Sequence, residues 1–423
     1  MSVTGDPEVM STDAPDLTGR VVIVGAGHAG GTVAALLRQY GWTGRITLIG
    51  EEPLPPYQRP PLSKAWLKGE ADGDSLALRP PSFYTEQSIT LRLSTGVAGI
   101  NVAARMVTLD SGEAVAWDHL ILAVGAAARK LSAPGAELDG VLELRTAADA
   151  EQLKRALGPG KRLAVIGGGY VGLEAAASAR ALGAEAVVIE REPRVLARVA
   201  CPELSGFFQA YHAAQGVGFE VNAQVLGFAG DHGRVTGVLL GDGRTLPCDA
   251  ALVGIGALPH ESLARLAGCA CNHGIVVDEA ARTSVPGIYA IGDCTQRPLP
   301  LYGLSGRLES VPNALEQAKQ AAAHLCGRPA PAPETPWFWS DQYDLKLQIA
   351  GLPYHAVTRV IRGDPAQAKF AVFHLDADNR VQAVEAVNAP PEFMAGRQLV
   401  GNRKPVAPEK LRDMSVSMKE VAA

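Results

Sequence analysis

Two glycine-rich loops, each set between an apolar strand and a helix, predict an α/β protein with two Rossmann-like dinucleotide-binding domains and a C-terminal α+β domain. The loops occupy residues 25–31 and 167–172. A proline-rich linker at residues 327–336 precedes a last segment that alternates in strand fashion. The length of 423 residues suits two or three domains, at roughly 150 residues each.

The first unit begins with the apolar run at residues 21–24, followed by Gly25-Ala-Gly-His-Ala-Gly-Gly, a helical stretch to about residue 40 and a strand at residues 45–49. In a dinucleotide-binding unit, glycines let backbone N–H groups approach a pyrophosphate, and an acid after the second strand binds ribose hydroxyls. The strand here ends in Gly50, with two glutamates after it. We expect Glu51 to make the ribose contact.

The second unit repeats this order. Residues 163–166 form the strand, Gly-Gly-Gly-Tyr-Val-Gly the loop, and residues 186–189 the next strand, with a helix through about residue 182 between them. Glu190 follows that strand directly. One GxGxxG pattern has a real false-positive risk, whereas two copies in the right context predict two dinucleotide sites and a relay from one cofactor to the other.

The remaining elements follow in order. Strands at residues 120–124 and 251–255 end in glycines where the chain crosses between domains, and residues 310–326 have helical periodicity. Three more strands are expected at residues 346–351, 370–375 and 381–388. The predicted boundaries are a disordered N-terminus at 1–18, one domain at 19–124 and 254–332, a second at 125–253, and the C-terminal domain at 333–423.

Composition excludes several classes of protein. The net charge of −5 gives no bulk field for nucleic acid or an anionic membrane. The six cysteines begin at Cys201 and form no CxxC pair, so we expect no metal site. The polar N-terminus does not resemble a signal peptide, and no apolar run reaches the ~18 residues of a membrane span. We therefore expect a cytoplasmic protein without a membrane partner.

Six motifs in order, VVIVGAGHAGG, PYQRPPLSK, VIGGGYVGLE, TSVPGIYAIGDC, RLESVPNALEQA and WFWSDQYDLK, cover nearly the whole chain. With them the sequence resembles the FAD-dependent NADH:ferredoxin reductases of the putidaredoxin reductase type, which serve cytochromes P450 and Rieske-type oxygenases. The resemblance implies a glutathione reductase-like fold, in which an NADH domain interrupts an FAD domain. It also implies two cofactors, FAD and NADH.

Residue by residue, the resemblance implies two sets of contacts. The FAD contacts are Gly25, Gly27, Ala29, Gly30, Glu51, Arg59, Lys64, Val97, Arg145, Asp293, Val311 and Trp339, and the NADH contacts are Gly167, Gly169, Gly172 and Glu190. Lys64 and Glu174 resemble an ion pair beside flavin N5. There a cation stabilises the reduced flavin, and the carboxylate neutralises that cation when the flavin is oxidised. The alternative is that Lys64 is a surface lysine and Glu174 an exposed glutamate on a helix, with no role at the flavin.

Three functions stay open on the sequence. The first is transfer of single electrons from NADH to a [2Fe–2S] ferredoxin, with Lys319 and Arg397 as docking residues for an acidic partner. The second is reduction of a small acceptor, such as a quinone or an ascorbate radical. The third is a flavoprotein like apoptosis-inducing factor, which the net charge of −5 disfavours. Disulfide reductases of this fold carry a cysteine pair after the first unit, and here that region has no cysteine.

Overall fold

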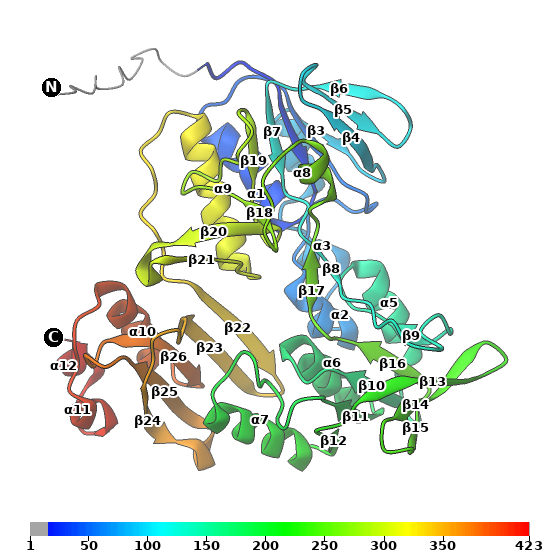
Figure 1. Ribbon diagram of the computed structural model, residues 1–423, viewed down its shortest axis with the longest axis vertical. Coiled ribbons are helices and arrows are strands. Elements are labelled where there is room, and N and C mark those ends of the chain that lie inside the picture. The colour runs from blue at the N-terminus through cyan, green and yellow to red at the C-terminus, as the bar shows by residue number, and fades with distance from the viewer. Residues whose placement is uncertain (1–15, 423) are drawn as a thin grey trace, which may run out of the picture.

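The computed structural model describes residues 16–422. Figure 1 shows three bodies, with the N-terminal part at the top, the middle of the chain at the lower right and the C-terminal part at the lower left. Of the N-terminal segment expected to be disordered, residues 1–15 lie outside the described residues. The carbonyl of Leu17 accepts hydrogen bonds from the N–H groups of Thr43 and Gly44, so the described chain is already anchored there.

A parallel sheet, here called the first sheet, has the strand order β19-β7-β1-β2-β3. The strands are β1 (Val21–Val24), β2 (Ile46–Ile49), β3 (Ile89–Arg92), β7 (His119–Leu122) and β19 (Ile288–Ala290). Helix α1 (His28–Gln39) and helix α9 (Val311–Leu325) pack together on it. Strand β19 is far along the chain, so two separate stretches of sequence build one sheet (Figure 1).

The second sheet repeats the parallel pattern in the order β12-β11-β10-β16-β9. Its strands are β9 (Val141–Leu142), β10 (Arg162–Ile166), β11 (Glu185–Ile189), β12 (Val217–Glu220) and β16 (Ala250–Val253). The helices of this part are α5 (Ala147–Ala156), α6 (Tyr170–Ala181) and α7 (Pro202–Ala214). Two short antiparallel strands, β8 (Ala126–Ala128) and β17 (Ala257–Pro259), carry the chain to and from the first sheet.

The C-terminal sheet is antiparallel, with the order β22-β23-β26-β25-β24. It comprises β22 (Trp337–Gln342), β23 (Leu345–Gly351), β24 (Thr358–Asp364), β25 (Lys369–Leu375) and β26 (Val381–Val387), which confirms the three strands predicted by alternation. Helices α10 (Pro390–Asn402), α11 (Pro408–Arg412) and α12 (Met418–Ala422) contribute to a core on one face. Leu347 and Val372 on the other face share a buried core with Phe208 of α7.

Smaller elements surround these sheets. Two of them are antiparallel three-stranded sheets. One contains β4 (Val97–Asn101), β5 (Met106–Leu109) and β6 (Ala114–Ala116). The other contains β13 (Val225–Asp231), β14 (Arg234–Leu240) and β15 (Thr245–Pro247). The others are η1 (Pro60–Ser63), α2 (Ala65–Lys68), α3 (Gly73–Leu76), α4 (Pro81–Glu86), α8 (Ser262–Leu266), β18 (Ile275–Val276), β20 (Thr295–Leu299), η2 (Pro300–Tyr302), β21 (Leu304–Gly306) and η3 (Pro365–Gln367). Among residues 16–422, no helix combines the length and apolarity needed to cross a bilayer.

Candidate active site

The first glycine loop turns tightly between β1 and α1. Gly25 has φ +111°, and a Cβ added there would lie 2.2 Å from the Ala123 carbonyl oxygen. A Cβ on Gly30 would lie 1.9 Å from the Gly25 carbonyl oxygen. Both positions therefore require glycine, because any side chain would strike backbone. Ala29, between them in the first turn of α1, is buried.

The start of α1 has the features of an anion site. Its first residue follows Gly27, which provides no side-chain cap for the helix N–H groups. A Cβ added at Gly27 would meet no atom within 4 Å, so the loop has an open side there. The Nδ1 atom of His28 is buried without a hydrogen-bond partner, and burial lowers the pKa of His28. Uncapped N–H groups beside an open glycine fit a pyrophosphate.

Three predicted FAD contacts come together through polar groups. Arg59 binds the Glu52 carboxylate at 2.7 Å and donates to the Arg145 carbonyl oxygen at 2.6 Å. Arg145 in turn binds the Asp293 carboxylate at 2.7 Å. The Tyr57 hydroxyl donates to Glu52 and accepts from Arg59. This chain of side chains joins the PYQRPP segment to the end of β19.

Glu52 belongs to this hydrogen-bonded network, but the sequence did not reveal it, because the prediction fell on the preceding residue, Glu51. Glu51 is exposed and forms no hydrogen bond or ion pair with another described side chain. Its ribose contact stays a prediction. Val97 and Val311 are half-buried, at the start of β4 and of α9. The signal for Glu52 was the nearby Tyr57 and Arg59 pair, whose polar groups need an acceptor.

The second glycine loop has the same geometry as the first. A Cβ on Gly167, with φ +104°, would lie 2.4 Å from the Gly254 carbonyl oxygen, and one on Gly172 would lie 2.3 Å from the Gly167 carbonyl oxygen. Gly169, at the start of α6, corresponds to Gly27, since a Cβ there would also meet no atom within 4 Å. The molecule therefore presents two equivalent dinucleotide loops.

Glu190 is fixed beside this second loop. One carboxylate oxygen accepts the Gly168 N–H at 2.7 Å, and the other accepts the Glu192 N–H at 2.9 Å. Arg191 has 79% of its side chain exposed and pairs with Glu192 at 3.1 Å. The carboxylate at the loop is held by backbone, whereas the neighbouring guanidinium is directed to solvent.

Lys64 and Glu174 form an ion pair between η1 and α6. Lys64 Nζ lies 2.6 Å from a Glu174 carboxylate oxygen, with 18% and 6% of the two side chains exposed. The Ser63 hydroxyl donates to the same oxygen at 2.5 Å, and the Ser340 hydroxyl donates to the other at 2.6 Å. The pair is neither a surface lysine nor an exposed glutamate, because the carboxylate is buried and fully engaged.

The network continues beyond Glu174 in a way that the sequence reasoning did not foresee. Gln342 donates to the Ser340 hydroxyl at 3.0 Å, and its amide oxygen lies 2.7 Å from Nε2 of His212 in α7. Ser340 and Gln342 stand at i and i+2 on β22, so both point to the same face. One row of polar side chains therefore links all three bodies of the molecule.

His212 gives this network a pH dependence. Burial lowers the pKa of His212 from 6.5 to about 4. The unfolded chain therefore takes up the proton first as the pH falls, and we expect stability to decline between pH 6.5 and about 4, by about 3 kcal/mol in total. The variant His212→Gln should show a shallower decline in that window. Urea unfolding at several pH values measures it, and parallel curves for both proteins would contradict the assignment.

Trp337 and Trp339 lie on one face of β22, with ring centroids 5.6 Å apart. Trp337 also contacts Phe393 of α10 and the Arg397 guanidinium. Trp339 immediately precedes Ser340, which bonds Glu174. The position of Trp339 over a flavin stays a prediction.

The two proposed docking cations are bound to the same carboxylate. Lys319 of α9 lies 2.9 Å from one oxygen of Glu334, and Arg397 of α10 lies 3.3 Å from the other. From the sequence, both were predicted as docking residues for an acidic partner. The linker that carries Glu334 instead neutralises part of this surface, so any basic face here is weaker than two free cations would make it.

Cys294 is the cysteine adjacent to the Arg145–Asp293 pair, and it is fully buried. Its Sγ lies 3.3 Å from the Ile291 carbonyl oxygen, and burial raises the pKa of the thiol to about 12. A thiol in this state is a poor nucleophile at neutral pH. The cysteine nearest in sequence to these side chains is thus structural.

Comparisons with known proteins agree with this geometry. The family described as pyridine nucleotide-disulphide oxidoreductase matches residues 19–318, and the reductase C-terminal family matches residues 337–422. The chain is 51% identical to a probable ferredoxin reductase of Castellaniella defragrans over 95% of this chain and 98% of the relative. It is 44% identical to putidaredoxin reductase of Pseudomonas putida, covering 95% and 96% of the two chains.

A solved structure gives the same result. The putidaredoxin reductase in a covalent complex with putidaredoxin superposes with a TM-score of 0.93, at 43% identity, covering 95% of this chain and 98% of that chain. The predicted fold is confirmed by this match. The chain therefore belongs to the pyridine nucleotide-disulphide oxidoreductase family, among its ferredoxin reductases.

Proposed function

We propose that this protein oxidises NADH and passes the electrons singly to a [2Fe–2S] ferredoxin that serves a cytochrome P450 or a Rieske-type oxygenase. The observation that carries the proposal is the similarity over 95% of the chain to putidaredoxin reductase, whose solved complex contains putidaredoxin. The buried Cys294 supports it, because no reactive thiol stands beside Asp293 to receive the electrons.

The first loop would hold FAD and the second NADH. Bound FAD supplies the conversion of a two-electron input into single-electron output. Gly27 and the uncapped start of α1 would receive the pyrophosphate, while Arg59, Arg145 and Asp293 would provide charged groups along the cofactor. Gly169 and Glu190 would provide the matching contacts for NADH.

Lys64 and Glu174 would act together near the reacting ring. Lys64 holds a positive charge that is compensated by Glu174 at 2.6 Å. Ser63 and Ser340 fix the carboxylate by donating to its two oxygens. A cation held in a largely buried place stabilises negative charge nearby without rearrangement. The two serines are positioning residues, since they act through the carboxylate.

A steady-state assay separates this function from its alternatives. Purified protein is given NADH with a [2Fe–2S] ferredoxin, a quinone or ferricyanide as the acceptor. We expect rapid reduction of ferredoxin, detected with cytochrome c. At the same acceptor concentration, the rate of quinone reduction should be lower. Quinone reduction that exceeds ferredoxin reduction with several ferredoxins would favour the small-acceptor alternative. A cytoplasmic location is part of the proposal, and cell fractionation tests it.

The cofactor preference follows from Glu190. A carboxylate held at the ribose position repels a 2′-phosphate, and the neighbouring Arg191 is directed to solvent. We expect kcat/KM for NADH to exceed that for NADPH by about tenfold or more, since a like-charge contact costs several kcal/mol. Glu190→Gln should reduce the ratio. Equal values for both cofactors in the wild type would overturn the assignment.

The docking surface makes a further prediction. Lys319→Glu and Arg397→Glu each place a second carboxylate next to Glu334 and should raise the KM for an acidic ferredoxin several-fold. Ferricyanide reduction should not change, because a small acceptor needs no docking face. Glu334→Gln is the matched variant, and it should lower the KM. Equal losses toward both acceptors would point to damaged flavin chemistry, and unchanged KM values would place docking elsewhere.

A further inference from the structure

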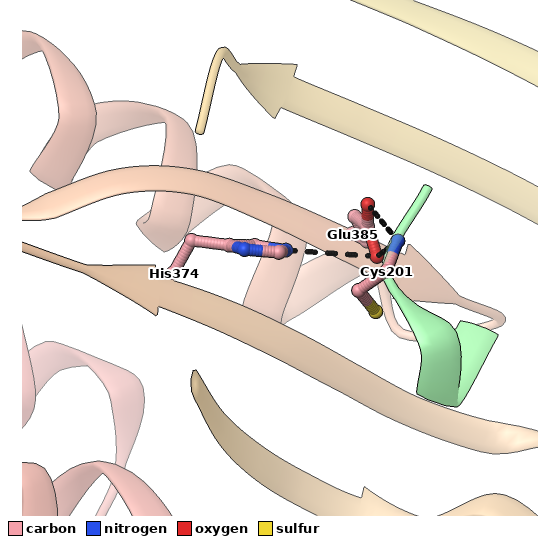
Figure 2. Close-up of side chains that lie close together, drawn as sticks. All are labelled: Cys201, His374 and Glu385. Carbon is pink, nitrogen blue, oxygen red and sulfur yellow. Dashed lines mark hydrogen bonds and ion pairs between the residues drawn. The ribbon is translucent and has the colours of Figure 1, made fainter. Parts of the chain in front are cut away.

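Three potential metal ligands meet where the start of α7 reaches the C-terminal sheet (Figure 2). Cys201 precedes α7, while His374 and Glu385 stand on the neighbouring strands β25 and β26. One ligand atom from each lies within 4.8 Å of the others. Their exposed fractions are 6%, 4% and 3%, so the cluster is in the interior.

The hydrogen bonding of this cluster is incomplete. The Cys201 N–H donates to the Glu385 carboxylate at 3.1 Å. His374 Nε2 lies 3.6 Å from the other carboxylate oxygen, beyond hydrogen-bond distance, and is buried without a partner. Figure 2 shows this nitrogen directed at the carboxylate. An unpartnered buried nitrogen is costly, and its orientation into a set of ligands indicates that something else binds it.

The cluster also contains no permanently charged cation. Among the described residues, no lysine or arginine forms an ion pair with Glu385. Arg359, on the strand next to β25, is bound to Glu203 at 3.0 Å. A buried carboxylate without a cation is strongly unfavourable. A divalent cation with one carboxylate, one thiolate and a neutral imidazole gives a net charge of zero.

We propose that Cys201, His374 and Glu385 bind one Zn²⁺ ion that fastens α7 to the C-terminal sheet. Sulfur, imidazole nitrogen and carboxylate oxygen together are the donors that zinc takes in proteins. The thiol loses its proton to solvent when the metal binds, and water or Glu203 completes four-coordination. The sequence predicted no metal site because the cysteines form no CxxC pair, and these three ligands share no local motif that would have shown otherwise.

Metal analysis of the FAD-containing full chain, purified without a histidine tag, tests the site. The protein is incubated with Zn²⁺ and dialysed against metal-free buffer, and its zinc is measured by mass spectrometry. We expect about one zinc per chain. Cys201→Ala and His374→Ala should lose it, whereas Cys248→Ala, a matched buried cysteine outside the cluster, should keep it. Zinc that is absent from the wild type, or equally present in Cys201→Ala, overturns the proposal.

Cobalt substitution keeps the test decisive if the variants do not fold. Co²⁺ bound to the wild type through Cys201 should produce the ultraviolet charge-transfer band of a thiolate ligand. Zn²⁺ should also raise the Tm of the wild type, because it binds only the folded chain. If the wild type shows no charge-transfer band and no change in Tm, the proposed zinc site is wrong, whatever the variants show.

Discussion

Replacing Lys64 with methionine is expected to slow reduction of the bound flavin by NADH about 100-fold or more. The substitution removes the cation that Glu174 compensates at 2.6 Å, and in the proposed arrangement it leaves the negative charge of the reduced flavin unopposed. Stopped-flow absorbance of the bound flavin measures the rate directly. Lys68→Met is the matched lysine variant, since Lys68 pairs with Glu70 near the surface and should leave the rate unchanged.

Stability can be separated from chemistry in the same experiment. Lys64→Met leaves the Glu174 carboxylate, with 6% of its side chain exposed, without its cation, at a cost of about 3 kcal/mol. The double variant Lys64→Met/Glu174→Gln removes that uncompensated charge. We expect it to recover stability but not the rate. Recovery of the rate as well would show that Lys64 acts only by keeping the fold intact.

Gly27→Ala is expected to weaken FAD binding on the order of 10- to 100-fold without destabilising the apoprotein. The backbone at Gly27 has φ −87°, which alanine adopts, and its Cβ would meet no atom within 4 Å. The added methyl therefore intrudes only on a bound dinucleotide, where overpacking costs about 1–3 kcal/mol. Fluorescence titration of apoprotein with FAD measures the Kd, and urea unfolding measures the stability.

Gly169→Ala is the internal control for that result. It makes the same change in the second loop, at φ −81°, with no atom within 4 Å. We expect it to retain FAD and to raise the KM for NADH. Loss of FAD from Gly169→Ala rather than from Gly27→Ala would show that FAD binds the second loop and NADH the first. Unchanged binding in both variants would remove the loops from cofactor binding altogether.

The sequence predicts the parts of this site that depend on local pattern. Gly25, Gly30 and Glu190 lie within short βαβ units, where the strand ends and the helix start determine their positions. Lys64 and Glu174 are far apart in sequence, and only the resemblance to a family paired them. The structure supplies the contact at 2.6 Å.

Other residues carry no sequence signal that could have revealed them. Ser340 and Gln342 are polar positions on an alternating strand, and their contacts with Glu174 and His212 depend on how β22 packs against α6 and α7. In the sequence, Glu334 is an ordinary charged residue of the linker. Only the fold places it between two cations. Such contacts arise from tertiary packing, which periodicity does not encode.

The position of β19 at the edge of the first sheet has a consequence for biosynthesis. The ribosome completes every strand of the second sheet before it makes β19, which pairs with β7. Nascent chains generally fold one domain after another from the N-terminus. Here we expect the inserted segment to mature first, while β7 waits with an unpaired edge that invites association with other chains. Chaperone capture should therefore be greatest during translation between the ends of β16 and β19.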